Sequence, residues 1–276
     1  MKKVLTQDGS FTFYSELFQE NYHTLAGAEK ESLEKFIIPS KILEDDSIVS
    51  VLDIGFGLGY NTLKLIEETM RRNKKVAVTA FEFQKDPVIQ SACQLKGFQQ
   101  EVLKTLLEKS HFETNLIDLK ILWGDARKTI HFIPDHSIHC VFLDPFSPPK
   151  NPELWSFHFF NQIKKKLTLN GKILTYSSSL PVISGLIQSG FYTGYTKPFG
   201  RKRGGVIASL NPKDIVFPLT QKDLFLLYTS IDGIPNRDKN YDSKEKMIFQ
   251  REKLCQYLKY NHFKLSHKKA LKIFEK

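Results

Sequence analysis

The sequence predicts an α/β protein with a Rossmann-like fold, in which a seven-stranded, mostly parallel sheet is covered by helices on both faces. Three observations predict this fold. From Ser50 onward, apolar strand-like runs alternate with helical patterns. A glycine-rich loop follows the first run, and only a short loop separates the last two. Strands separated by helices need right-handed crossovers and pair in parallel, whereas the last two can form an antiparallel hairpin at the sheet edge.

The strands of this sheet are expected where the apolar runs are short. They fall at residues 50–54, 76–81, 119–123, 138–143, 171–176, 191–196 and 205–210. Helices are expected between them where apolar residues recur at helical spacing. They fall at about 60–72, 87–109, 152–167 and 180–189. In open sheets of this kind ligands bind outside the carboxyl ends of the strands, so the residues just after each strand are the site candidates.

The chain also carries an extension on each side of this core. The N-terminal extension, residues 1–49, is expected to contain a short strand at 11–14 and a helix at 26–36. The core spans 50–210, and prolines at 212 and 218 mark its end. The C-terminal extension, residues 211–276, is expected to hold a strand at 224–228, a polar loop at 232–240 and an amphipathic helix at 243–260.

Length and composition limit the class of protein. The 276 residues, 41% of them hydrophobic, can bury the core of one large domain with an appended piece. The first residues lack the apolar segment of a signal peptide, and no apolar run is long enough to cross a bilayer. The sequence therefore predicts a cytoplasmic protein without a membrane partner.

The formal charge of +10 is unevenly distributed. From Asn211 onward 14 Lys and Arg face 8 Asp and Glu, a net charge of +6 in 66 residues, which leaves +4 for the first 210. These lysines are either a solvated surface or a contact for a polyanionic partner such as RNA.

The glycine loop follows directly from the first strand, in the segment Val51 to Asn61. Glycines let the backbone turn sharply and approach a ligand, while the next helix offers free N–H groups. The spacing is shorter than the G-x-G-x-x-G of dinucleotide sites, and the preceding carboxylate repels a pyrophosphate but suits a cationic ligand. S-adenosylmethionine (AdoMet) meets that requirement. The candidate cofactor residues of this segment are Asp53, Gly55, Phe56, Gly57, Gly59 and Asn61.

Carboxylates follow the second and third strands as well. Glu82 comes 23 residues after Gly59, where nucleotide folds place a carboxylate that accepts hydrogen bonds from both ribose hydroxyls. The alternative is a solvated charge at a strand end. Asp125 follows the third strand, where it either accepts a hydrogen bond from the adenine amino group or caps a following helix.

The fourth strand ends at Asp144, which opens a loop with four prolines that reaches Trp155. A carboxylate on such a stiff loop, beside a methyl donor, is placed to bind and orient an amine and to guide its proton away. We expect Phe146 and Trp155 to form apolar walls that desolvate the amine, since burial disfavours its cation. The alternative for Asp144 is a structural cap near Pro152.

The turn between the last two strands carries Arg201, Lys202 and Arg203 between glycines. It lies on the side from which a substrate approaches, so its cations either contact a phosphate or are merely solvated. The histidines at 131, 136, 139 and 158 form no recognisable ligand set, and no metal is expected.

The segments Asp53–Asn61, Leu122–Asp125, Asp144–Trp155 and Gly200–Arg203 together resemble the methyltransferase domain of MnmC-type tRNA-modification enzymes, over about residues 5–210. The resemblance implies a class I AdoMet-dependent methyltransferase fold. It also implies tRNA as partner and methylation of the aminomethyl group at carbon 5 of the wobble uridine, often a 2-thiouridine. Asp144 would be the catalytic residue, and Lys150 belongs to the matching Pro-x-Lys-Asn-Pro core. The N-terminal region, with Tyr14, would fold over the cofactor.

The resemblance departs from the bifunctional enzymes in one respect. Their flavin-dependent oxidase domain, which removes a carboxymethyl group before methylation, has no room in this sequence. The resemblance is to the stand-alone form, with no flavin, and implies that another tRNA-modifying enzyme supplies the aminomethyl group. Two alternatives stay open: methyl or aminopropyl transfer to a small-molecule amine, and a non-catalytic RNA-binding module.

Overall fold

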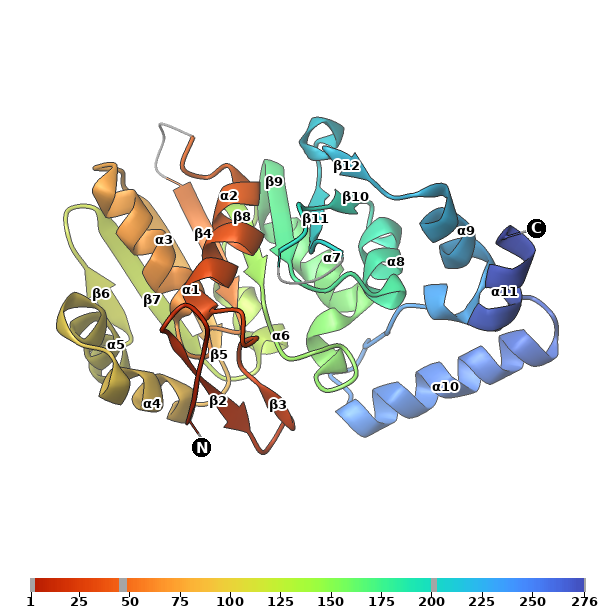
Figure 1. Cartoon of the computed structure of the whole chain (residues 1–276), viewed down its shortest axis with the longest axis horizontal. Coiled ribbons are helices and arrows are strands. Elements are labelled where there is room, and N and C mark those ends of the chain that lie inside the picture. Colours follow the sequence, from red (N-terminus) through yellow and green to blue (C-terminus); the bar gives the residue numbers. More distant parts are fainter. Residues whose placement is uncertain (1–2, 45–48, 200–202, 276) are drawn as a thin grey trace.

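The computed structural model describes residues 3–44, 49–199 and 203–275 (Figure 1). Its centre is a nine-stranded sheet with the strand order β12-β10-β11-β9-β8-β4-β5-β7-β6. Five neighbouring strands in it are parallel. These are β7 (Ile117–Trp123), β5 (Val76–Glu82), β4 (Val49–Ile54), β8 (Ile138–Leu143) and β9 (Leu167–Thr175). The expected α/β fold class is confirmed.

The remaining strands lie at the two edges. The hairpin of β10 (Tyr192–Tyr195) and β11 (Val206–Ser209) is antiparallel, and β11 also pairs antiparallel with β9. This agrees with the predicted hairpin. The sheet exceeds the seven expected strands because β6 (His111–Glu113) and β12 (Phe217–Pro218) add one short strand at each edge.

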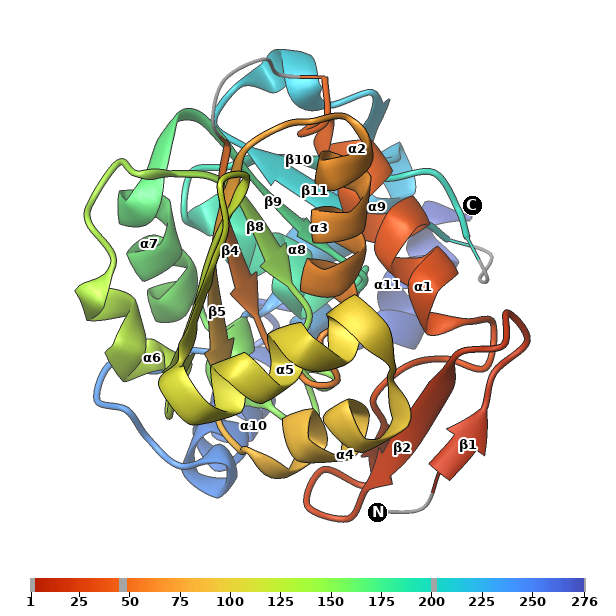
Figure 2. The ribbon, with the colours of Figure 1, turned by 90° about the vertical axis from the view of Figure 1, so that its left-hand side faces the viewer.

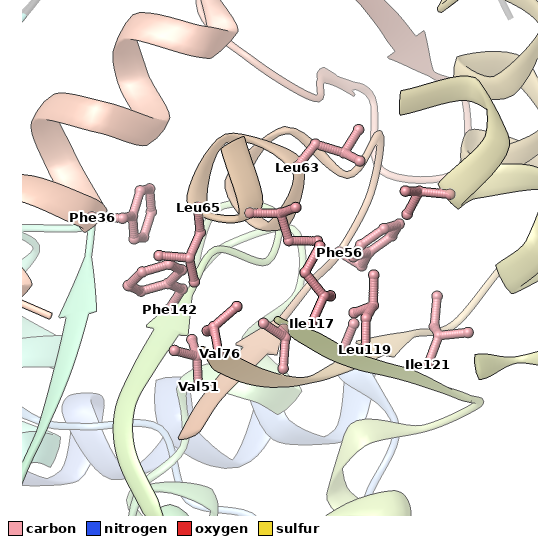
Figure 3. Close-up of a cluster of buried hydrophobic side chains, with 14 of the residues drawn as sticks. Phe36, Val51, Phe56, Leu63, Leu65, Val76, Ile117, Leu119, Ile121 and Phe142 are labelled. Carbon is pink, nitrogen blue, oxygen red and sulfur yellow. The ribbon is translucent and has the colours of Figure 1, made fainter. Parts of the chain in front are cut away.

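Successive residues of the central strands are buried on opposite faces of the sheet, as the two-residue strand period requires. Val51 packs in one apolar cluster and Leu52 in the other. The cluster with Val51 includes side chains of α3 (Tyr60–Arg71), α4 (Asp86–Gln94) and α5 (Gly97–Lys109) (Figure 3). The other includes α6 (Ala126–Thr129), α7 (Phe157–Lys166) and α8 (Leu180–Gln188). Figure 2 shows α3 and α7 on opposite sides of the strands.

The N-terminal segment packs on the glycine loop. It forms a small antiparallel sheet of β1 (Lys3–Leu5), β2 (Phe11–Ser15) and β3 (Glu20–Asn21), followed by α1 (Ala28–Glu31), the π-helical η1 (Ser32–Ile37) and α2 (Ile38–Ser40). Phe11 and Phe13 share a buried cluster with Leu58 and Tyr60. The extension is thereby attached where the loop enters α3.

Beyond the sheet the chain is helical. It contains the 3₁₀ turn η4 (Pro212–Asp214), α9 (Gln221–Thr229), the 3₁₀ turn η5 (Ile231–Gly233), α10 (Lys244–Tyr260) and α11 (His267–Phe274). A helix is confirmed where an amphipathic one was expected at 243–260, but only Met247 and Cys255 of α10 are buried, so its apolar face is narrow. The strand expected at 224–228 is wrong, because Thr220 and Asp223 form a capping box that starts α9.

Two predicted helices are interrupted. The helix expected at 87–109 is two helices, because Leu95 is extended and Gly97 has a positive φ. The helix expected at 152–167 starts with the 3₁₀ turn η3 (Pro152–Trp155), and Ser156 then caps α7 through the N–H of Phe159. Within the described ranges, no helix combines the length and apolarity that crossing a membrane requires.

Candidate active site

A cavity of about 820 Å³ opens at the carboxyl ends of the parallel strands. Residues that follow the strands form its floor, namely Gly55, Gly57, Glu82, Phe83, Gly124, Asp125, Asp144, Pro145, Phe146 and Tyr176. The N-terminal segment adds residues 17, 18 and 20–25 together with Glu31, Lys35 and Phe36. The first turn of α10 adds Ser243, Lys244 and Glu245. The wall therefore combines all three parts of the chain.

The glycine loop brings β4 close to the loop after β8. Gly55 has φ +88°, and a Cβ there would lie 2.9 Å from the backbone of Asp144 and of Pro145. Only glycine fits this approach without strain. The N–H of Gly57 donates to Glu82 Oε2 at 2.7 Å, and the N–H of Gln84 donates to Oε1 at 2.9 Å. Burial raises the pKa of Glu82, while these N–H donors act in the opposite direction.

Three of the predicted cofactor residues lie behind the wall rather than in it. Asp53 is fully buried beneath the loop and accepts a hydrogen bond from Thr62 Oγ1 at 2.6 Å. Burial raises its pKa to about 7. Phe56 packs in the apolar cluster of Figure 3 with Leu119, and Gly59 caps α3 in the left-handed conformation. These three residues shape the loop and do not line the cavity.

Asp144 lies at the floor of the cavity and is held by its neighbours. Its N–H donates to Ile54 O at 2.9 Å, and its Oδ2 accepts a hydrogen bond from Asn61 Nδ2 at 2.7 Å. Burial raises the pKa of Asp144 well above its usual range. The Asn61 bond opposes this rise, and the negative charges of Glu31 and Asp53 add to it.

The proline loop is fixed from the N-terminal side. The ring of Phe146 stacks on Phe18 with centroids 4.2 Å apart, and the edge of Tyr22 packs against it. The N–H of Ser147 donates to Glu20 Oε2 at 3.0 Å, and Lys150 Nζ donates to Gln19 Oε1 at 3.1 Å. Phe146 and Lys150 both line the cavity, and their contact with a substrate stays a prediction.

Trp155 requires a correction. Its side chain is fully buried in the core and does not form a cavity wall. The indole N–H donates to Phe146 O at 2.8 Å, and the ring packs edge-on against Tyr176. Trp155 therefore supports the loop from beneath, and of this aromatic pair only Tyr176 lines the cavity.

Asp125 caps α6 and lines the cavity as well. Its Oδ1 accepts from the N–H of Arg127 at 3.0 Å, and both carboxylate oxygens accept from the guanidinium. Arg127 Nη1 also donates to Asp238 Oδ2 at 2.7 Å and to Asp242 O at 3.0 Å. Arg127 thereby ties the cavity wall to the C-terminal extension.

Two further predicted positions lie away from the cavity. Tyr14, on β2, is 38% exposed and does not line the cavity. Tyr22 of the same segment lines the cavity instead. Arg203 is paired with Asp223, with Nη1 3.3 Å from Oδ1, and does not line the cavity. It precedes β11 by three residues, and β11 begins opposite Thr175, the last residue of β9. Arg201 and Lys202 lie outside the described residues.

A buried ion pair between Glu31 and Lys35 faces the cavity and was not predicted. Both residues are less than a tenth exposed. Burial acts to raise the pKa of Glu31, but the charge of Lys35 holds this pKa below its usual range. Beside them burial lowers the pKa of His23 to about 4. The i, i+4 spacing of Glu31 and Lys35 is equally typical of a solvated helix face, so the sequence held no distinguishing signal.

The residues present fit AdoMet as a cofactor. Gly55 and Gly57 line the cavity without side chains of their own, and Glu82 presents a carboxylate beside them. Acidic groups at 31 and 144 suit a ligand that carries an ammonium and a sulfonium. Across the three described ranges, no group of His, Cys, Asp and Glu side chains is arranged to hold a metal ion.

Comparisons with known proteins show which family this chain is similar to. A family described as S-adenosyl-L-methionine-dependent methyltransferase matches residues 90–211. The crystal structure of MNMC2 from Aquifex aeolicus superposes with a TM-score of 0.77 at 35% identity, over 91% of this chain and 83% of that one. An uncharacterized protein of Methanocaldococcus jannaschii is 30% identical over 93% of this chain and 73% of its own length.

A curated relative is longer than this chain. The tRNA 5-methylaminomethyl-2-thiouridine biosynthesis bifunctional protein MnmC of Campylobacter hominis is 30% identical over 72% of this chain, which spans about a third of its length (31%). The fold and the site define an AdoMet-dependent methyltransferase. Within that class, the chain belongs to the MnmC2 family.

Proposed function

We propose that this protein transfers a methyl group from AdoMet to the amino nitrogen of 5-aminomethyluridine, with or without a 2-thio group, at the wobble position of tRNA. The observation that carries the proposal is Asp144, which Asn61 holds at the floor of a cavity with aromatic walls. The relative from Campylobacter hominis is named for the synthesis of 5-methylaminomethyl-2-thiouridine in tRNA. Another tRNA-modifying enzyme would then supply the aminomethyl group.

AdoMet supplies an electrophilic methyl group on a sulfonium, and the acceptor must offer a neutral amine. A primary amine with a pKa of ~10.4 is almost fully protonated at neutral pH, and freeing its lone pair costs ~4 to 5 kcal/mol at pH 7. The chain's residues must lower this cost. Phe146, Tyr176 and the N-terminal segment line the cavity, and burial of the amine against them would disfavour its ammonium form.

Asp144 has two roles in this proposal. Its carboxylate binds the incoming ammonium and orients the nitrogen, with Asn61 fixing the carboxyl plane through Oδ2. Its raised pKa also brings it closer to the pKa of the amine, and each unit by which the two approach saves about 1.4 kcal/mol of proton transfer. Asp144 can thus receive the proton that the amine must lose.

The direct test is methyl transfer to RNA. Purified protein with methyl-labelled AdoMet should label tRNA that carries 5-aminomethyluridine, and nucleoside mass spectrometry should find the label in 5-methylaminomethyluridine. tRNA that lacks the aminomethyl group is the control and should stay unlabelled. Failure to label the aminomethylated tRNA would reject the proposal. Activity that survives complete digestion of the RNA would favour a small-molecule amine instead.

A further inference from the structure

Helix α10 begins at the cavity and runs away from it. Residues 243–245 line the cavity, and the 17 residues of the helix extend for about 25 Å toward α11 (Figure 1). Met247 and Cys255 anchor its inner face, and Arg251 Nε donates to Ile234 O at 2.9 Å. The outer face is therefore held in a fixed position relative to the cavity mouth.

One line of side chains on this outer face combines two cations with three aromatic rings. The basic–aromatic stripe consists of Lys246, Phe249, Lys253, Tyr257 and Tyr260. Their spacing of three and four residues places them along one side of the helix. The aromatic side chains are 59%, 60% and 84% exposed, in chain order, and Lys253 Nζ lies 5.3 Å from the ring centroid of Phe249.

The positive charge of the chain is concentrated in the segment that carries this stripe. Residues 243–276 contain 10 Lys and Arg and 3 Asp and Glu, a net charge of +7, whereas the first 242 residues contain 30 and 27, a net charge of +3. Lys246 Nζ forms an ion pair with Asp242 Oδ1, 2.6 Å away. An acidic protein surface would suit only the cations, and a neutral apolar surface would suit only the rings. RNA suits both, because its phosphates pair with the cations and its bases stack on the rings.

We propose that the basic–aromatic stripe of α10 binds unpaired nucleotides that flank the acceptor base, by stacking on the three rings and pairing phosphates with the lysines. The inference rests on the proposed function, since it assigns the surface that presents the RNA to the cavity. Bases of a tRNA loop are unpaired and stack readily on aromatic side chains. Because α10 starts at the cavity, a strand that follows the stripe arrives at the mouth.

The test removes the rings without touching the cavity. We expect the triple variant Phe249→Ala/Tyr257→Ala/Tyr260→Ala to bind a synthetic RNA stem–loop with 5-aminomethyluridine in its loop at least about 10-fold more weakly. KM for this RNA should rise in parallel, while kcat at saturating RNA and the Kd for AdoMet stay within about twofold. Tyr257→Phe/Tyr260→Phe should keep wild-type affinity, because stacking needs the ring and not the hydroxyl.

The matched control removes exposed apolar side chains elsewhere. Leu169 and Tyr192 are 86% and 53% exposed and lie at the opposite end of the sheet from the cavity, so Leu169→Ala/Tyr192→Ala should bind the stem–loop normally.

The cations of the stripe are tested through the salt dependence of binding. Lys253→Gln should reduce the slope of log Kd against log salt by about 0.7, the value for one phosphate of a single strand.

The outcomes separate the two proposals. If the wild-type protein labels the stem–loop and the triple variant has the wild-type KM, the inference about α10 is wrong and the proposed function stands. If the triple variant binds the stem–loop and a fully paired duplex more weakly by the same factor, the rings do not stack on unpaired bases, and the inference is again wrong. If the wild-type protein labels no RNA, the proposed function itself fails.

Discussion

Asn61 Nδ2 lies 2.7 Å from Asp144 Oδ2, and this hydrogen bond joins the first turn of α3 to the end of β8. Asn61 directly follows the glycine loop that is proposed to hold the methyl donor. The carboxylate proposed to hold the acceptor is therefore oriented by the donor loop itself. A shift of the loop would strain this hydrogen bond, so the positions of the donor loop and of Asp144 are expected to depend on each other.

The Asn61 bond can be tested through the pH dependence of activity. Asn61 lowers the pKa of Asp144, so Asn61→Ala should raise this pKa further. Ammonium binding needs the ionised carboxylate, and the acid limb of the kcat/KM profile should therefore move to higher pH. At pH 7 we expect a loss of about 10-fold, typical of a hydrogen bond to a charged group. Asn61→Asp, which adds a like charge, should move the limb further still, and a limb that moves to lower pH in either variant contradicts this role.

Asp144→Asn tests the carboxylate directly. The amide can neither bind an ammonium by charge nor accept its proton, so kcat should fall by about 10²- to 10⁴-fold, as on loss of a general base. AdoMet affinity, measured by calorimetry, should change little. Glu113→Gln, which alters a carboxylate with a 69% exposed side chain, is the control and should be as active as wild type. Near-normal turnover of Asp144→Asn would assign the proton transfer to another group.

Gly55→Ala should separate backbone strain from steric contact. The new Cβ would press on the backbone of Asp144 and Pro145 at 2.9 Å, in addition to the strain of φ +88°. Gly9 has nearly the same φ, +85°, with nothing within 4 Å of a Cβ. Gly9→Ala should therefore cost only the strain, about 1 kcal/mol. Urea denaturation should show a larger loss for Gly55→Ala, accompanied by loss of AdoMet binding in that variant alone.

Arg127→Met tests the link between the cavity wall and the C-terminal extension. It leaves Asp125 and Asp238 without their partner, and the Asp238 side chain is only 2% exposed. Breaking a buried pair in this way should lower the free energy of unfolding by about 3 to 5 kcal/mol. The double variant Arg127→Met/Asp238→Asn should recover part of that loss. By contrast, Arg71→Met removes a 61% exposed partner of Glu67 and should cost less than about 1 kcal/mol.

Asp53→Asn should change how stability depends on pH. The pKa of Asp53 is about 7 in the folded protein, against about 4 in an unfolded chain, so the folded state binds more protons between these values. Wild-type stability should therefore fall as pH rises through this window. The variant avoids this loss, and its advantage in free energy of unfolding should grow from pH 4 to pH 7 by up to about 4 kcal/mol. An advantage that stays constant with pH would show that Asp53 ionises normally.

Much of the sheet could be predicted because each local pattern pointed to one structure. The strand at Val49–Ile54 is apolar, ends at glycines and precedes a long amphipathic helix. The run at 224–228 was ambiguous, since five consecutive apolar residues are compatible with a strand and with a short helix. The capping box of Thr220 and Asp223 decides for helix α9, and this signal lies outside the run itself.

The site was predictable where it depends on strand ends and unpredictable where distant segments fold back. Glu82, Asp125 and Asp144 could be named because the carboxyl ends of parallel strands meet at one edge. Glu20 and Arg127 could not, because their contacts need the path of the N-terminal hairpin and of the C-terminal extension. Trp155 was assigned to the wall from its neighbours in the sequence, but its size and its indole N–H are accommodated beneath the loop.

The cavity wall draws on residues 17, 18 and 20–25 and on residues 243–245, and this has a consequence for synthesis. A ribosome makes the N-terminal hairpin and the sheet before α10, so the sheet can form while the wall is still incomplete. The nascent chain can therefore reach its folded core before it gains a finished pocket, and the pocket is complete only after α10 has been made.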